Sequence, residues 1–143
     1  MPLSKIPFTY FHNGIYRPVL QISIINPHTN LFQKTYGIID TGADDCAVPA
    51  SFAALLGHNL QEGLMKTIQT GNGETVAYTH TTKFEIFRPN TNKVAYTILD
   101  TPIDFMPNLP VVLLGVNSFL GKFVLRIDYP RKVFSIRRPK SSG

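Results

Sequence analysis

Turn-forming residues divide this chain into short segments along its whole length. The sequence contains 10 glycines and 11 prolines, which are too evenly scattered to permit a bundle of long helices. Between them lie runs of β-prone residues. Residues 19–25 are typical, because Leu20, Ile22 and Ile24 alternate with other side chains. The pattern predicts a strand-rich chain and excludes a parallel α/β fold, which needs regular crossover helices.

The same reasoning places the other elements along the chain. Further strands are expected at residues 64–70, 75–87, 93–99, 111–114, 123–127 and 132–136, with one more ending at Ile39. Short helices are expected at residues 49–56 and 116–120, each closed by a glycine. The sequence therefore predicts an all-β fold, a closed or orthogonally packed barrel with one or two short helices. One domain is expected over residues 1–138, with a disordered tail at 139–143.

Composition excludes several other classes of protein. Hydrophobic residues make up 43% of the chain and charged residues 16%, which argues against disorder. Cys46 is the single cysteine, so an internal disulfide and a cysteine-based structural zinc site are both excluded. No run approaches the ~20 apolar residues of a membrane helix, and no signal peptide is seen. We therefore expect a cytoplasmic protein, or an excised domain of a longer one, without a membrane segment.

Basic residues gather late in the sequence. The net charge is +5, and half of the 14 basic residues lie from Lys122 onward. A nucleic-acid-binding surface is one interpretation; the other is a solvated edge strand and tail, where such charges discourage edge pairing. We favour the second, because no nucleic-acid-binding motif accompanies the charge. The four histidines show no metal-ligand spacing, and no metal or cofactor is expected.

An aspartate at the end of an apolar strand carries the chemistry of this sequence. Asp40 follows Ile38-Ile39 and precedes Thr41-Gly42. A partly buried carboxylate needs compensation, and Gly42 lets the backbone turn tightly and offer its N–H. A purely structural alternative is a turn aspartate that bonds its own backbone. Cation binding with Asp44 and Asp45 is a weaker alternative, because the ligand alternation of a calcium loop is missing.

Two later segments extend this pattern. Gly71-Asn72-Gly73 separates two β-prone runs and predicts a hairpin. The apolar run at 111–114 is followed by Gly115. With Asp40-Thr41-Gly42, this order resembles the retropepsin-like aspartic proteases over about residues 19–136. The resemblance implies a retropepsin-like acid-protease barrel with one lobe per chain, and an endopeptidase that cleaves extended polypeptides.

The resemblance also implies roles for particular residues. The catalytic residues would be Asp40, Thr41 and Gly42. The residues that meet the substrate would be Ala43, Asp44, Asp45, Gly71, Asn72 and Gly73. The structural support of the site would come from Leu113, Leu114 and Gly115. Four further residues are candidate pocket walls, although plain core is the favoured interpretation for each: Val48, Ile68, Val111 and Val112.

One residue of the retroviral pattern is missing. Those enzymes commonly have an arginine after the second glycine, where this chain has Val116. The missing arginine leaves the bracing of Asp44 open, with Arg126 as a hypothetical substitute.

The chemistry requires a second carboxylate that this chain does not repeat. Two carboxylates about 3 Å apart share a proton, so that one can act as base and the other as acid. Asp100-Thr101-Pro102 replaces glycine with proline and cannot form a second such loop. The second Asp40 must come from another chain across a two-fold axis, and the sequence predicts a homodimer. The resemblance implies that segments near 8–11 and 133–137 help to join the chains.

Two further expectations complete the functional hypothesis. A non-catalytic retropepsin-like module for dimerisation or peptide binding is the alternative to an enzyme. The intact Asp-Thr-Gly favours the enzyme, because a pure scaffold has no use for a costly, partly buried carboxylate. Ala43 offers no hydroxyl to stabilise an ionised carboxylate, so activity is expected in mildly acidic to near-neutral solution.

Overall fold

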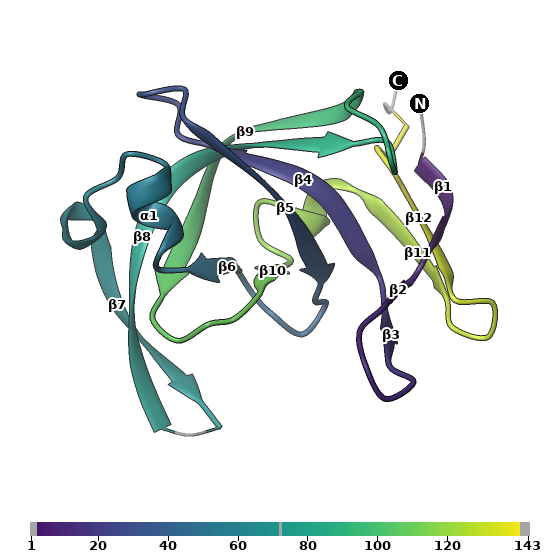
Figure 1. Cartoon of the computed structure of the whole chain (residues 1–143), viewed down its shortest axis with the longest axis horizontal. Coiled ribbons are helices and arrows are strands. Elements are labelled where there is room, and N and C mark those ends of the chain that lie inside the picture. The colour runs from purple at the N-terminus through teal and green to yellow at the C-terminus, as the bar shows by residue number, and fades with distance from the viewer. Residues whose placement is uncertain (1–2, 72, 141–143) are drawn as a thin grey trace.

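The chain folds mainly into strands, as Figure 1 shows for a computed structural model that describes residues 3–71 and 73–140. The strands are β1 (Leu3–Pro7), β2 (Thr9–Tyr10), β3 (Tyr16–Arg17), β4 (Val19–Ile25), β5 (Phe32–Ile39), β6 (Cys46–Pro49), β7 (Leu64–Thr70), β8 (Gly73–Phe87), β9 (Val94–Met106), β10 (Val112–Leu114), β11 (Val124–Asp128) and β12 (Val133–Arg137). The helical segments are α1 (Phe52–Leu55) and the 3-10 turns η1 (Leu60–Glu62) and η2 (Leu120–Lys122). No helix in these described ranges is long and apolar enough to cross a membrane.

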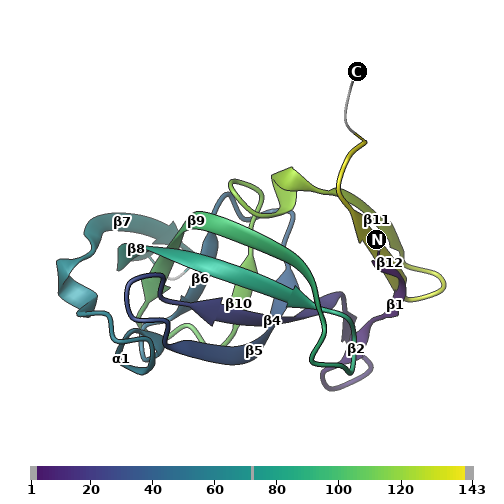
Figure 2. The same cartoon turned by 90° about the horizontal axis from the view of Figure 1, so that it is seen from above.

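Most of the strands form one closed barrel. Their order in the sheet is β4-β5-β10-β6-β9-β8-β7, and β4 also pairs with β8. This last pairing closes the sheet and leaves β7 outside the barrel, paired with the first half of β8. The β7–β8 hairpin and the small sheet β1-β12-β11 lie at opposite ends of the barrel (Figures 1 and 2). The site predicted around Asp40 falls between these two ends.

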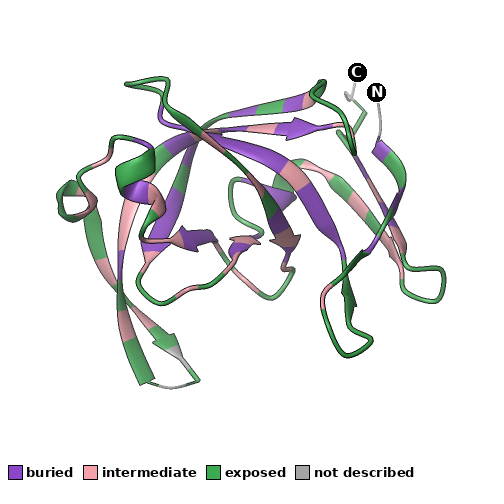
Figure 3. Cartoon of the chain, viewed as in Figure 1, coloured by how far each residue is buried: buried purple, intermediate pink, exposed green. Residues whose placement is uncertain are grey.

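The barrel interior is filled by alternating apolar side chains. Leu20, Ile22 and Ile24 of β4 are buried, as their spacing predicts. The largest fully buried side chains include Phe84, Phe105, Phe119 and Phe134. Figure 3 shows the buried residues along the barrel strands and the exposed ones along the β7–β8 hairpin. The hairpin therefore packs against the barrel at its base and is exposed toward its tip.

Strand β10 is inserted between two strands that precede it in the sequence. It runs parallel to β5, where Leu113 pairs with Ile38, and antiparallel to β6, where Leu113 pairs with Ala47. Gly37 permits this approach, since a Cβ there would lie 2.7 Å from the Leu114 side chain. The insertion places the end of β10 beside the end of β5, where Asp40 follows.

The two predicted helices differ from those observed. Residues 49–56 contain α1 over Phe52–Leu55 only, because Pro49 still belongs to β6. The prediction of a helix at 116–120 is wrong. Ser118 has a φ of 63°, which breaks a right-handed helix, and the chain forms turns that lead into η2. The sequence pattern did not distinguish this apolar turn from a helix.

Candidate active site

The loop after β5 holds Asp40 through the backbone. The N–H of Asp40 donates to the carbonyl of Leu114 at 3.0 Å, and the N–H of Ala43 donates to the carbonyl of Asp40 at 3.1 Å. The N–H of Gly42 donates to Oδ1 of Asp40 at 3.0 Å, as the sequence predicted. Asp40 is partly exposed, and Thr41 and Gly42 are exposed. The carboxylate is thus oriented by its own loop and remains accessible.

The turn after β10 packs directly against this loop. Val116 N–H donates to the Ala43 carbonyl at 2.9 Å, and Asn117 N–H donates to the Asp44 carbonyl at 2.7 Å. A Cβ on Gly115 would lie 2.5 Å from the carbonyl carbon of Asp45. Only glycine permits this approach of two backbone segments, and Gly115 is one of the residues predicted to support the site. Leu114 behind it is fully buried.

Cys46 forms a further contact between these segments. Its Sγ accepts the N–H of Gly115 at 3.4 Å, and the residue is fully buried. Burial raises the pKa of the Cys46 thiol to about 12. A thiol with this pKa stays protonated and unreactive in ordinary buffers, so its role here is packing.

A cleft of about 450 Å³ opens between the Asp40 loop and β7. Its lining residues are Gly42, Ala43, Asp44, Asp45, Ala47, Lys66, Thr67, Ile68, Gln69, Asp104, Met106 and Leu113. The predicted contact residues of the loop therefore do lie in one hollow. Asp40 and Thr41 lie outside this lining.

The tip of the hairpin and the other predicted pocket walls lie elsewhere. Gly71 and Gly73 are exposed at the hairpin tip, and the predicted Asn72 falls outside the described residues. Of the candidate pocket walls, Ile68 lines the cleft, whereas Val48 is fully buried core. Val111 and Val112 line a different hollow, beside Phe52.

A charged cluster that the sequence reasoning missed lies in the cleft wall. Lys66 Nζ lies 2.8 Å from Asp104 Oδ2 and 3.3 Å from Asp45 Oδ2. Burial alone would lower the pKa of Lys66, but the hydrogen bonds and charges of Asp104 and Asp45 outweigh it and raise the pKa. The one available signal was Asp104 itself, an acidic residue between the apolar Ile103 and Phe105.

The bracing of the loop differs from the hypothesis. Arg126 lies on β11, where it pairs with Ser135, and no ion pair within the described chain joins it to Asp44. Asn117 takes part instead, through its N–H to Asp44 and a long contact of 3.5 Å from its side-chain amide to Asp45 Oδ1. In the part of the chain described here, no three His, Cys, Asp or Glu side chains are grouped as metal ligands.

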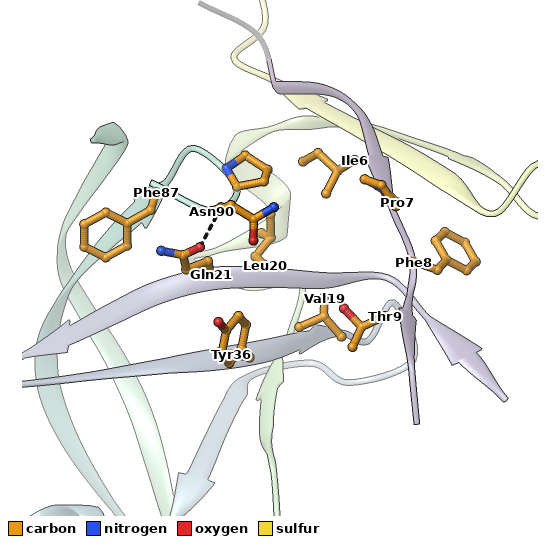
Figure 4. Close-up of a pocket in the computed structure, with 11 residues that line it drawn as sticks. Ile6, Pro7, Phe8, Thr9, Val19, Leu20, Gln21, Tyr36, Phe87 and Asn90 are labelled. Carbon is orange, nitrogen blue, oxygen red and sulfur yellow. Dashed lines mark hydrogen bonds between the residues drawn. The ribbon is translucent and has the colours of Figure 1, made fainter. Parts of the chain in front are cut away.

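A separate hollow on the outside of the barrel carries no comparable chemistry. It lies between β1, β4 and the turn that joins β8 to β9 (Figure 4). Its lining includes no charged residue. The amide of Gln21 is already used there, because its oxygen accepts the N–H of Asn90 at 3.0 Å and its nitrogen donates to the Thr91 carbonyl at 2.7 Å. The Gln21 side chain thus stabilises the turn, and its amide is not available to bind a ligand in this hollow.

Comparisons with known proteins identify the fold. No family model matches the sequence, and no curated protein matches it. Among solved structures, the crystal structure of a retropepsin-like aspartic protease from Rickettsia conorii is similar, with a TM-score of 0.63. The match covers 95% of this chain and 92% of that one at 22% sequence identity. The predicted fold class is therefore confirmed: the chain has an all-β, single-lobe retropepsin-like fold.

Proposed function

We propose that this chain is an aspartic endopeptidase that hydrolyses peptide bonds of extended polypeptides. One observation carries the proposal. Within a retropepsin-like fold, the single Asp-Thr-Gly of the sequence lies at the end of β5 and presents a partly exposed carboxylate. The N–H of Gly42 orients that carboxylate. A scaffold without catalysis has no physical need for this arrangement.

The proposed reaction uses two Asp40 carboxylates, one from each subunit of a homodimer. Held about 3 Å apart, they carry one proton between them. The ionised carboxylate takes a proton from water, which attacks the peptide carbonyl carbon. The protonated one donates its proton to the carbonyl oxygen. Breakdown of the tetrahedral intermediate returns a proton to the leaving amine. Thr41 and Gly42 would orient the pair, and the β7–β8 hairpin would act as a lid.

The terminal sheet suggests where the second chain pairs. Residues 133–137, expected to join the chains, form β12, and β12 is already paired on one side with β1 and on the other with β11. Among the described residues, both edges of β12 are thus paired within the subunit. Strand β11 is an outer strand of this sheet, and the chain before it leads directly from the turn behind Asp40. We therefore place the second copy along β11, with both Asp40 loops at the two-fold axis.

Cleavage of a peptide library from pH 3 to pH 8 tests the activity. The natural protein is compared with Asp40→Asn, and a transition-state-mimicking aspartic-protease inhibitor is added. The matched control is Asp100→Asn, because Asp100 is exposed and has a φ of 50° that asparagine adopts readily. We expect cleavage in mildly acidic to near-neutral solution that Asp40→Asn and the inhibitor abolish and Asp100→Asn retains. A folded dimer that cleaves nothing would favour the non-catalytic module.

Mixing experiments test the shared site. With freely exchanging subunits, a threefold excess of Asp40→Asn chains should reduce the activity of a fixed amount of natural chain to about a quarter, because only homodimers of natural chains keep both carboxylates. A site contained in one chain would keep its full activity under the same mixing. Sedimentation at several concentrations measures the dimer independently of cleavage.

A further inference from the structure

Lys66 connects three separate parts of the fold. It lies on β7, the outer strand of the hairpin, and its ammonium reaches two carboxylates. Asp104 belongs to β9 in the barrel wall, and Asp45 belongs to the loop between Asp40 and β6. One side chain therefore ties the hairpin to the barrel and to the loop that holds the proposed catalytic carboxylate.

The contact with Asp104 is the firm one. Asp104 is only 4% exposed, and Oδ1 accepts the hydroxyl of Thr79 at 2.8 Å while Oδ2 meets Lys66 at 2.8 Å. Its neighbours in the strand, Ile103 and Phe105, are fully buried. A carboxylate in such surroundings is strongly destabilised without a cation. The buried Asp104 carboxylate therefore holds the Lys66 ammonium in place.

The contact with Asp45 is weaker and more exposed. The distance is 3.3 Å, and the Asp45 side chain is 40% exposed. Among the described residues, its other oxygen has only the 3.5 Å contact with Asn117. Of the two ion pairs of Lys66, the one with Asp45 is therefore the more easily broken.

Strand β7 has few other attachments. It is the last strand of its sheet, and β8 is its only partner strand in the described part of the chain. Leu64 and Met65 at its start are 75% and 63% exposed, so they contribute little packing. Among the ion pairs of residues 3–71 and 73–140, those of Lys66 alone join β7 to another element.

We propose that Lys66 is a positioning residue that sets the position of the β7–β8 hairpin over the Asp40 loop. Asp104 is the fixed anchor and Asp45 the contact that opens and closes. Lys66 acts through the hairpin and does not touch the reacting atoms. The inference rests on the proposed function in so far as the hairpin covers a substrate, but the anchoring itself concerns the free protein.

Hydrogen exchange of the free protein tests the anchoring without any substrate. The main variant is the double substitution Lys66→Met with Asp104→Asn, which removes the tie and leaves no buried charge that would unfold the barrel. We expect amides of residues 64–71 and 74–79 to exchange at least about tenfold faster, with β4 unchanged. The single variant Lys66→Arg, with Asp104 unchanged, should keep the slow exchange of the natural protein. Lys83→Met is the matched control and should change nothing, because this lysine of β8 lies beyond the hairpin, opposite Ile25 of β4.

Steady-state kinetics on a cleaved peptide provide the second readout. In the double variant KM should rise about tenfold with kcat within about twofold, because a displaced lid weakens binding rather than chemistry. The single variant Lys66→Arg should keep the KM of the natural protein. Unchanged hydrogen exchange in the double variant, or a loss confined to kcat, would overturn the inference. Faster exchange in a protein that cleaves nothing would uphold the anchor and refute the protease instead.

Discussion

Substitution of Gly115 by alanine tests the central packing of the site. The added Cβ would lie 2.5 Å from the carbonyl carbon of Asp45 and 2.9 Å from the carbonyl oxygen of Ala43. Both contacts are with backbone atoms of the loop that follows Asp40, so no flexible side chain can move aside. Overpacked cores lose about 1–3 kcal/mol, and we expect the upper end, about 3 kcal/mol.

The expected loss of stability corresponds to a measurable fall in the melting temperature. A chain of 143 residues has an unfolding entropy of about 0.3 kcal/mol per kelvin, so 3 kcal/mol lowers Tm by about 10 °C. Thermal unfolding followed by circular dichroism measures the shift. Peptide cleavage at a temperature where the variant stays folded should fall further than its stability, because the displaced loop carries Asp40.

Gly71→Ala is the matched control for this experiment. A Cβ on Gly71 meets nothing within 4 Å, so Tm should stay within about 2 °C of the natural value, a change of under about 0.6 kcal/mol. If Gly115→Ala also stays within that range, the two backbone segments do not approach as described. The argument that Gly115 supports the site would then fail.

Three more perturbations test other parts of the fold. Cys46 should resist a thiol reagent at pH 8 in the folded protein and react fully in urea, because burial raises its pKa to about 12; equal rates in both states would contradict the packing. The pKa of His58 is lowered by burial and by the neighbouring His80. Below about pH 6.5 the unfolded state therefore binds more protons than the folded state. The urea midpoint should therefore fall with pH below 6.5 more steeply in the natural protein than in His58→Phe. Asn26→Ala should lose about 1–3 kcal/mol in urea unfolding, because the buried Asn26 amide donates to the Leu56 carbonyl at 2.8 Å; an unchanged midpoint would show that this bond is dispensable.

Elements with strong local signals were predictable from the sequence. The strand at 64–70 has the predicted bounds, because the signal, two β-prone runs on either side of an Asn-Gly sequence, acts within a few residues. The strand at 93–99 was predicted too short. It continues through Asp100-Thr101-Pro102 to Met106, since pairing with β8 and a local irregularity at Thr82 carry the chain past the proline. Long-range pairing overrode a local breaker there.

The contacts of the site likewise divide into local ones that the sequence predicts and long-range ones that it does not. The bond from Gly42 to Asp40 involves residues two apart and follows from the local sequence. The contacts of Lys66 depend on strands β7 and β9 meeting the loop that carries Asp45, which a linear pattern does not encode. The pairing of β12 with β1 was not predicted for a related reason, because the two strands come from opposite ends of the chain.

The insertion of β10 between β5 and β6 has a consequence for the order of folding. The carbonyl that holds the N–H of Asp40 belongs to Leu114, which is synthesised long after the Asp40 loop itself. Contacts between such distant segments form slowly and late. A nascent or truncated chain that lacks β10 therefore has the Asp-Thr-Gly sequence without its geometry. The proposed activity should appear only after nearly the whole domain has been made and folded, which protects the growing chain from its own reaction.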